Sequence, residues 1–181
     1  NSENIYYYLT VYNEPYTQPA EPDNLDVEGL LKGIYLYQGA GKQRKKNAQI
    51  LASGVGMNWA LKAAKLLESD WGVNASVWSV TSWNELRRDG LAVDRHNLLN
   101  PSNQRTAYIT SKLRGAEGPV IAVSDYMRAV QDQVAPWVEQ EFASLGTDGF
   151  GLSDTRGALR RHFKVDAESI VIATLSSLAK A

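Results

Sequence analysis

The residues with the clearest chemical potential lie in a glycine-rich segment, residues 146–156, which reads Gly-Thr-Asp-Gly-Phe-Gly-Leu-Ser-Asp-Thr-Arg. Three glycines within six residues favour a tightly turned loop, because glycine adopts backbone conformations that other residues avoid. Two carboxylates and a guanidinium in the segment are suited to a local ion pair that would hold its shape. We interpret it as an ordered structural or interface loop, not a catalytic site, formed by Asp148, Gly149, Phe150, Gly151, Asp154 and Arg156.

A second glycine motif, Ser53-Gly-Val-Gly-Met57, lies between an expected strand and an expected helix. Nucleotide-binding folds place a phosphate loop at this position, where backbone N–H groups at a helix N-terminus meet the phosphate. The third glycine of that pattern is replaced here by Trp59, and no acidic residue ends the next strand. We therefore favour a tight turn, and keep nucleotide binding through Gly54 and Gly56 as an alternative.

The remaining polar residues do not assemble a catalytic set. The chain has no cysteine and two histidines, His96 and His162, and it lacks the Gly-x-Ser-x-Gly pattern of a nucleophilic serine. Two histidines without spaced acidic ligands make a zinc site improbable, and no calcium-binding loop occurs. We interpret both histidines as structural and assign no catalytic, cofactor-binding or metal-binding residue.

Charge and hydrophobicity narrow the classes of partner. The net charge of −1 gives no electrostatic basis for binding nucleic acid or an anionic membrane, although Lys42, Arg44, Lys45 and Lys46 form one basic loop. No apolar run approaches the roughly 20 residues that span a bilayer. The absence of cysteine fits a reducing compartment. We expect a cytoplasmic protein whose basic loop is solvated.

Short apolar runs alternate with amphipathic segments along most of the chain. We expect strands at 33–38, 48–52, 75–80, 119–123 and 142–145, and helices at 26–32, 57–69, 83–88, 93–99, 125–135, 153–163 and 166–180. The turn signal Asp89-Gly90 separates the third and fourth helices. Strands of four to six residues alternating with helices predict an α/β fold with three layers, in which helices cover both faces of a mostly parallel mixed sheet.

The N-terminal part has a different composition. Residues 5–11 are aromatic and β-branched, which predicts a strand buried on both faces. Pro15, Pro19 and Pro22 follow among polar residues and exclude a helix or a central strand. We divide the chain into residues 1–12, the last strand of a preceding domain, a linker at 13–26 and a domain at 27–181.

The glycine-rich segment, continuing through Leu159-Arg-Arg-His-Phe163 to Val165-Asp166, resembles the C-terminal domain of the homodimeric bacterial pyruvate dehydrogenases of the transketolase superfamily. Further motifs match in order: Asn13-Glu14, Tyr16, Pro19-Ala20, Gly29, Lys32-Gly33-Ile34-Tyr35, Ser53-Gly54, Val80-Thr81-Ser82, Glu85-Leu86, Arg88-Asp89-Gly90 and Ser124-Asp125-Tyr126-Met127. The resemblance covers essentially the whole chain. Thr17 stands where family members often have a histidine.

The resemblance implies a parent enzyme that decarboxylates pyruvate on thiamine diphosphate and magnesium, then reductively acetylates a lipoyl group of dihydrolipoyl acetyltransferase. The residues for that chemistry lie upstream in such enzymes, so the resemblance implies that this domain holds no cofactor. Residues 1–12 would end the pyrimidine-binding domain. We expect a structural role in domain packing and in the homodimer interface. The alternatives are a docking module for the acetyltransferase, through residues 42–46, and a free-standing nucleotide-binding domain.

Overall fold

The computed structural model describes residues 4, 6–7, 11, 15–41 and 46–180. Five strands form one sheet in the order β1-β3-β2-β4-β5. Their bounds are β1 (Ile34–Gln38), β2 (Asn47–Ala52), β3 (Asn74–Val80), β4 (Val120–Val123) and β5 (Phe142–Leu145). The pairs β2–β3, β2–β4 and β4–β5 are parallel, and only the edge pair β1–β3 is antiparallel. The predicted mostly parallel mixed sheet is confirmed.

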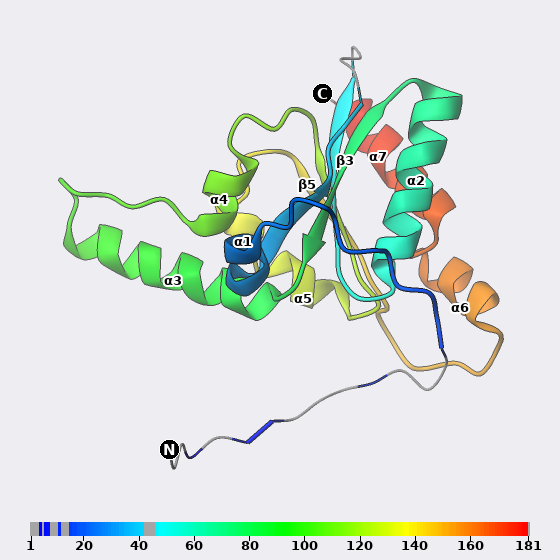
Figure 1. Ribbon diagram of the computed structural model, residues 1–181, viewed down its shortest axis with the longest axis horizontal. Coiled ribbons are helices and arrows are strands. Elements are labelled where there is room, and N and C mark those ends of the chain that lie inside the picture. The colour runs from blue at the N-terminus through cyan, green and yellow to red at the C-terminus, as the bar shows by residue number, and fades with distance from the viewer. Residues whose placement is uncertain (1–3, 5, 8–10, 12–14, 42–45, 181) are drawn as a thin grey trace.

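Helices cover both faces of this sheet (Figure 1). On one face lie α2 (Gly56–Trp71), α6 (Arg156–Phe163) and α7 (Ala167–Leu178). The other face carries α1 (Val27–Lys32), α3 (Trp83–Leu99), α4 (Tyr108–Leu113), α5 (Arg128–Asp132) and the short 3-10 helix η1 (Ala135–Trp137). The three-layer α/β fold expected from the sequence is therefore present.

The sheet separates two apolar cores because successive strand residues point to opposite faces. In β2, Ile50 packs with α2 and α7, whereas the next residue, Leu51, packs with α3 and α4. Both side chains are fully buried. Each face therefore has its own helical layer, and the loops at the ends of the strands are positioned by two cores.

The helix α3 corrects one prediction. It continues from Trp83 to Leu99, so Asp89 and Gly90 do not form the turn that was expected to divide it. A Cβ on Gly90 would lie 2.4 Å from ring carbons of Trp137. The glycine thus permits a close approach between a helix and an indole ring, and Trp137 Nε1 donates to Asp94 at 3.1 Å. A close tertiary contact, not a turn, accounts for this glycine.

Two further helices differ from the sequence prediction. The short α4 was not predicted, and it begins without a side-chain cap. The helix expected at 125–135 is reduced to α5, followed by η1. Within α5, the fully buried Gln131 donates through Nε2 to Leu145 O, at the end of β5, at 3.0 Å.

Most of the predicted N-terminal strand, 5–11, lies outside the described residues. Its described members, Tyr6, Tyr7 and Val11, are exposed and have no strand assignment. The described part of the linker, 15–26, has no helix or strand and runs along the domain surface. Tyr37 Oη donates to Ala20 O at 2.8 Å, which holds the linker against β1.

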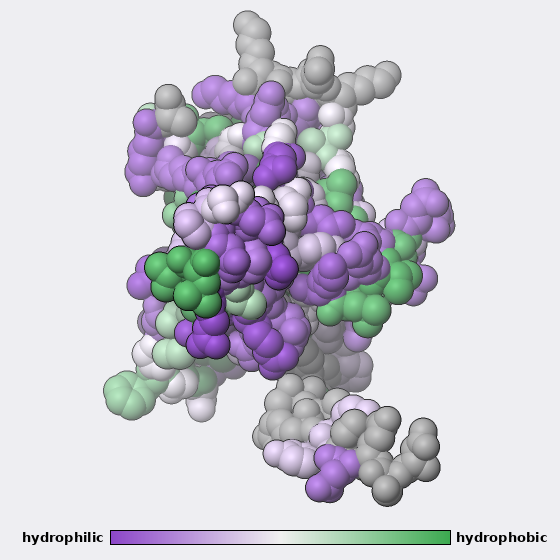
Figure 2. Space-filling model, turned by 90° about the vertical axis from the view of Figure 1, so that its left-hand side faces the viewer, coloured by the Kyte–Doolittle hydropathy of each residue, from purple (hydrophilic) through white to green (hydrophobic). Residues whose placement is uncertain are grey.

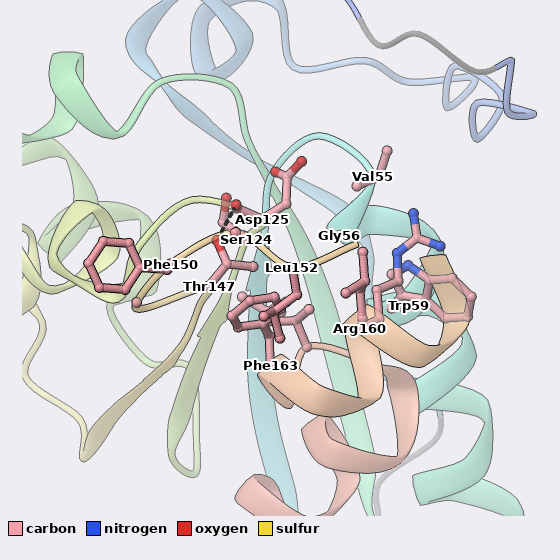
Figure 3. Close-up of a pocket in the computed structure, with 15 residues that line it drawn as sticks. Val55, Gly56, Trp59, Ser124, Asp125, Thr147, Phe150, Leu152, Arg160 and Phe163 are labelled. Carbon is pink, nitrogen blue, oxygen red and sulfur yellow. Dashed lines mark hydrogen bonds between the residues drawn. The ribbon is translucent and has the colours of Figure 1, made fainter. Parts of the chain in front are cut away.

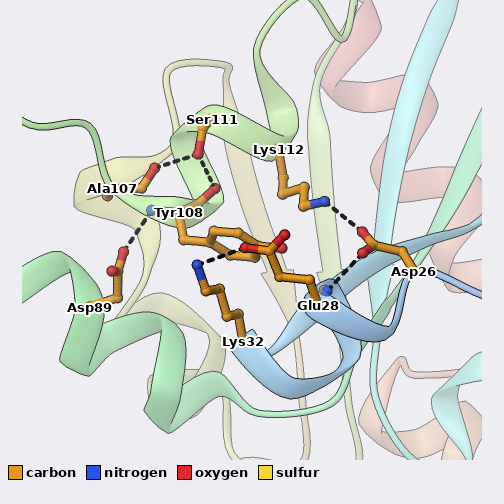
Figure 4. Close-up of polar contacts among 9 residues, drawn as sticks. Asp26, Glu28, Lys32, Asp89, Ala107, Tyr108, Ser111 and Lys112 are labelled. Atoms are coloured by element: carbon orange, nitrogen blue, oxygen red, sulfur yellow. Dashed lines mark hydrogen bonds and ion pairs between the residues drawn. The ribbon is translucent and has the colours of Figure 1, made fainter.

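A polar cluster, which we call the α1–α4 clasp, joins α1 to the neighbouring helix α4 on the same face of the sheet (Figure 4). Asp26 caps α1 by accepting from Gly29 N at 2.9 Å, and it also binds Lys112 Nζ at 2.5 Å. Lys32 and Lys112 lie 5.0 and 5.3 Å from the ring centroid of Tyr108. The linker's end is thereby fixed to α4.

The surface on the left of Figure 1 is mainly hydrophilic, with separate hydrophobic groups (Figure 2). In the described part of the chain, no helix is long and apolar enough to cross a membrane.

Candidate interface site at the carboxyl edge of the sheet

The candidate site lies where the parallel strands end, along what we call the carboxyl edge, at the bottom of Figure 1. Here the turn after β2, the loop after β4 and the loop after β5 lie next to one another. In open α/β sheets this edge is where ligands and partners bind, because the strand-to-helix loops converge there. The glycine-rich segment is the β5 loop.

A buried hydrogen-bond network fixes the base of this edge. Ser53 Oγ donates to Ser124 Oγ at 2.9 Å and accepts from Trp83 Nε1 at 3.1 Å. Ser124 Oγ also accepts from Tyr126 N at 3.1 Å. Because Ser53 and Ser124 are buried, these bonds are protected from exchange with water and hold the β2 turn to the β4 loop.

The β4 loop in turn holds the beginning of the glycine-rich segment. Thr147 N donates to Tyr126 O at 2.9 Å, and Thr147 Oγ1 donates to Asp125 O at 2.6 Å. A Cβ on Gly146 would lie 2.5 Å from Tyr126 O, so only glycine allows this approach. The two loops therefore form one rigid unit (Figure 3).

Asp148 makes its ion pair with Arg128, a residue that the sequence analysis did not select. Arg128 N donates to Oδ1 at 2.9 Å, and Arg128 Nε donates to Oδ2 at 2.6 Å. These bonds lower the pKa of Asp148, first through the Arg128 side chain and then through its backbone N–H. The pair ties the glycine-rich segment to α5 but is largely exposed, so its energetic contribution is small.

Beyond this anchor the segment presents apolar side chains to solvent. Gly149 has φ of +95°, which favours glycine, and Phe150 follows with 95% of its surface exposed. Phe150 is among the residues that line the neighbouring cavity, and its ring extends to one side of the other lining residues (Figure 3). Leu152 is also exposed. An aromatic ring held in water by a rigid loop has the character of an interface anchor.

The end of the segment begins α6. Thr155 is the N-cap and accepts from Ala158 N at 3.4 Å, so the helix begins later than the predicted start at residue 153. The carboxylate of Asp154 accepts from Thr155 N at 2.6 Å instead. Arg156 is the first residue of the helix.

The glycine motif of the β2 turn has a structural explanation. The amides of Gly56 and Met57 donate to Ser53 O and Gly54 O at 3.0 and 3.2 Å. A Cβ on Gly56 would lie 3.3 Å from Val123 O, so a glycine here allows the turn to pack closely against β4. These amides are therefore engaged within the turn and are not presented to a phosphate.

Each of the two histidines makes a local contact. His96 Nε2 bonds with Asn103 O at 2.9 Å beyond α3, and the His162 ring packs edge-on against Phe163. Within the described residues, no group of three or more His, Asp or Glu side chains could hold a metal ion. The basic loop falls at residues 42–45, outside the described residues, apart from Lys46, which is exposed.

The fold and this edge define a known class of domain. Residues 33–166 match the family described as the transketolase-like TK C-terminal domain, and the chain belongs to that family. Solved transketolases share the fold: the enzyme of Leishmania mexicana has a TM-score of 0.56 at 19% identity over 87% of this chain and 20% of that one. A chain titled "Split gene transketolase, inactive beta4 tetramer" has a TM-score of 0.55 at 20% identity, over 82% of this chain and 43% of that one.

Relatives found by sequence point to a narrower group of proteins within this family. The chain is 62% identical to the pyruvate dehydrogenase E1 component of Mycolicibacterium smegmatis, 58% to that of Mycobacterium tuberculosis and 43% to that of Escherichia coli. These matches cover 98–99% of the chain but only 19–20% of each relative. The family resemblance drawn from the sequence motifs is confirmed, and the chain spans about a fifth of its relatives' length.

Proposed function

We propose that this chain acts as the C-terminal domain of a pyruvate dehydrogenase E1 component. The whole enzyme would decarboxylate pyruvate on thiamine diphosphate and reductively acetylate the lipoyl group of dihydrolipoyl acetyltransferase in the cytoplasm. High identity to E1 components over the full chain supports this assignment. We place the thiamine diphosphate and its magnesium in the parts of the enzyme outside this chain, because the sequence contains no Gly-Asp-Gly motif for binding the metal and the diphosphate.

Within that enzyme, the domain has a structural role: its carboxyl edge docks against the other domains or the homodimer partner. The observation that carries this proposal is Phe150, which is 95% exposed although its loop is firmly anchored. A flexible loop would lose conformational entropy on docking, whereas a preorganised one keeps most of its binding energy. Gly149 and Gly151 leave room around the ring for a partner surface.

The test is Phe150→Ala in an intact E1 enzyme that contains this domain. Loss of a buried interface aromatic should weaken dimerisation or domain docking by at least about 2 kcal/mol, while single-turnover decarboxylation follows only as a consequence. Leu98→Ala, at an exposed leucine on α3, is the matched control and should change neither the association nor the decarboxylation rate. A Phe150→Ala enzyme with unchanged melting and association, but with decarboxylation slowed a hundredfold, would assign the loop to the active site instead.

Docking of the acetyltransferase through the basic loop is the competing proposal. A titration of this chain with the acetyltransferase core separates the two. Saturable binding that is lost when Lys42, Lys45 and Lys46 are replaced by Gln would favour the docking module.

A further inference from the structure

Two cavities adjoin on the face that carries α2, α6 and α7, and they share the side chains of Trp59 and Arg160. The Arg160 guanidinium stacks over the Trp59 ring at 4.9 Å from its centroid. Figure 3 shows the two side chains together at one end of the first cavity. The stacked pair therefore forms the partition between them.

The first cavity, of about 340 Å³, is mainly apolar. Val55, Leu159 and Phe163 line it, together with residues 149–152 of the glycine-rich segment. Ser124, Asp125 and Thr147 add a few polar groups on one side. A cavity of this size and lining suits a planar or apolar group of a small molecule.

The second cavity, of about 880 Å³, has a different character because cations line it. Its basic residues are Lys62, Arg160, Arg161 and Lys164, and its acidic residues are Asp166 and Glu168.

Both carboxylates of this cavity are engaged. Glu168 binds Lys62 Nζ at 2.9 Å, and Asp166 caps α7 by accepting from Ser169 N at 3.0 Å. Arg160, Arg161 and Lys164 have no ion-pair partner among the described residues. Arg161 still acts on Glu168, because it helps Lys62 to lower the pKa of that carboxylate. With four cations and two carboxylates, the lining keeps a net positive charge that attracts an anion.

The backbone at Lys164 supports a role for its side chain. With φ of +61°, it is the only non-glycine residue of the described chain in the left-handed region. Glycine or asparagine is usual at such a helix C-cap, and a lysine there carries a conformational cost. Cations in the last turn of α6 also interact favourably with the helix dipole, which gives them a second, structural role. A binding measurement distinguishes the two roles.

We propose that the paired cavities bind a phosphate monoester that carries a planar or apolar group. The phosphate would lie against Arg160, Arg161 and Lys164, and the apolar group would fill the first cavity beside Phe163. This site is separate from the β2 glycine turn, whose amides are already engaged.

The experiment is calorimetry of the 181-residue chain with three probes: AMP, adenosine and inorganic phosphate. AMP should bind at least about tenfold more tightly than either fragment, because only AMP engages both cavities. R160Q and R161Q should each weaken AMP binding about tenfold, as expected for the loss of a charge-assisted contact. R87Q, on α3 across the sheet, is the matched control and should leave binding unchanged.

Circular dichroism and melting curves establish that each variant is folded, and exposed Arg161 provides a test even if R160Q disturbs the stack on Trp59. Absence of AMP binding at millimolar concentration would overturn the proposal. Equal affinity for AMP and adenosine would also overturn it, because it would show that the cations contribute nothing. So would a loss of AMP affinity in R87Q as large as that in R160Q and R161Q.

Discussion

Glycine has opposite roles at two helical positions, and this contrast gives a test at the scale of single residues. Gly90 in α3 faces Trp137 at a distance that no Cβ tolerates, whereas a Cβ on Gly157 in α6 would meet nothing within 4 Å. Gly90→Ala should therefore destabilise the domain by about 1–3 kcal/mol through overpacking, despite alanine's better helix propensity. Gly157→Ala should stabilise it by up to about 1 kcal/mol.

Urea unfolding of the two variants beside the wild type measures both effects. A Gly90→Ala variant at least as stable as the wild type would mean that Trp137 moves aside without loss. In that case the presence of glycine at position 90 would need a different explanation.

Phe150 provides a second test at this scale. Burial of the ring within the chain would make Phe150→Ala cost about 3–5 kcal/mol. Because the ring is 95% exposed, we expect the isolated chain to lose no more than about 0.5 kcal/mol. A thermal melt of the isolated variant checks this, and a large loss would mean that the ring packs on its own domain.

At the scale of elements, hydrophobic pattern predicted the sheet well. The strands expected at 48–52, 75–80 and 142–145 are observed within one residue of those limits, because short buried runs between turn signals have few other solutions. Helix limits were predicted less well. The N-cap of α6, the short α4 and the end of the helix at 125–135 depend on contacts that a local pattern does not contain.

The α1–α4 clasp predicts a pH dependence. Lys112 and the Gly29 amide lower the pKa of Asp26 from its ordinary value of 3.8, and Asp26 raises the pKa of Lys112. A carboxylate with a depressed folded-state pKa stabilises the fold above its unfolded pKa, and that contribution is lost as pH falls through the folded value. Lys112→Met should therefore cost about 0.5–1 kcal/mol at neutral pH, because both partners are partly exposed.

Below pH 3.8 the difference between the Lys112→Met variant and the wild type should shrink as Asp26 is protonated. Urea unfolding at several pH values measures it, with Lys65→Met as an exposed lysine control. A difference that stays constant through this range would mean that Lys112 acts by packing on Tyr108 and not through its charge.

At the scale of the whole molecule, the sequence analysis placed the glycine-rich segment correctly after the last strand but did not find Arg128, the partner of Asp148. Asp148 and Arg128 are 20 positions apart, and they meet because β4 and β5 are neighbours and their following loops converge. Strand order is a property of the assembled sheet, so no local pattern near Asp148 contained this contact.

The proposed position of the cofactor site, outside this chain, also gives a prediction. We expect the isolated chain to show no micromolar binding of thiamine diphosphate with magnesium and no turnover of pyruvate. Calorimetry and a decarboxylation assay measure both. Binding at micromolar affinity would place part of the cofactor site on this domain.

The direction of the last helix has a practical consequence for such experiments. After α6 at the carboxyl edge, α7 runs back across the sheet, so its C-terminal end lies at the opposite edge (Figure 1). A fluorophore or an immobilisation handle joined beyond α7 would therefore point away from Phe150 and from the proposed docking face. Surface-coupled binding measurements can use that end as the point of attachment and leave the candidate interface open to solution.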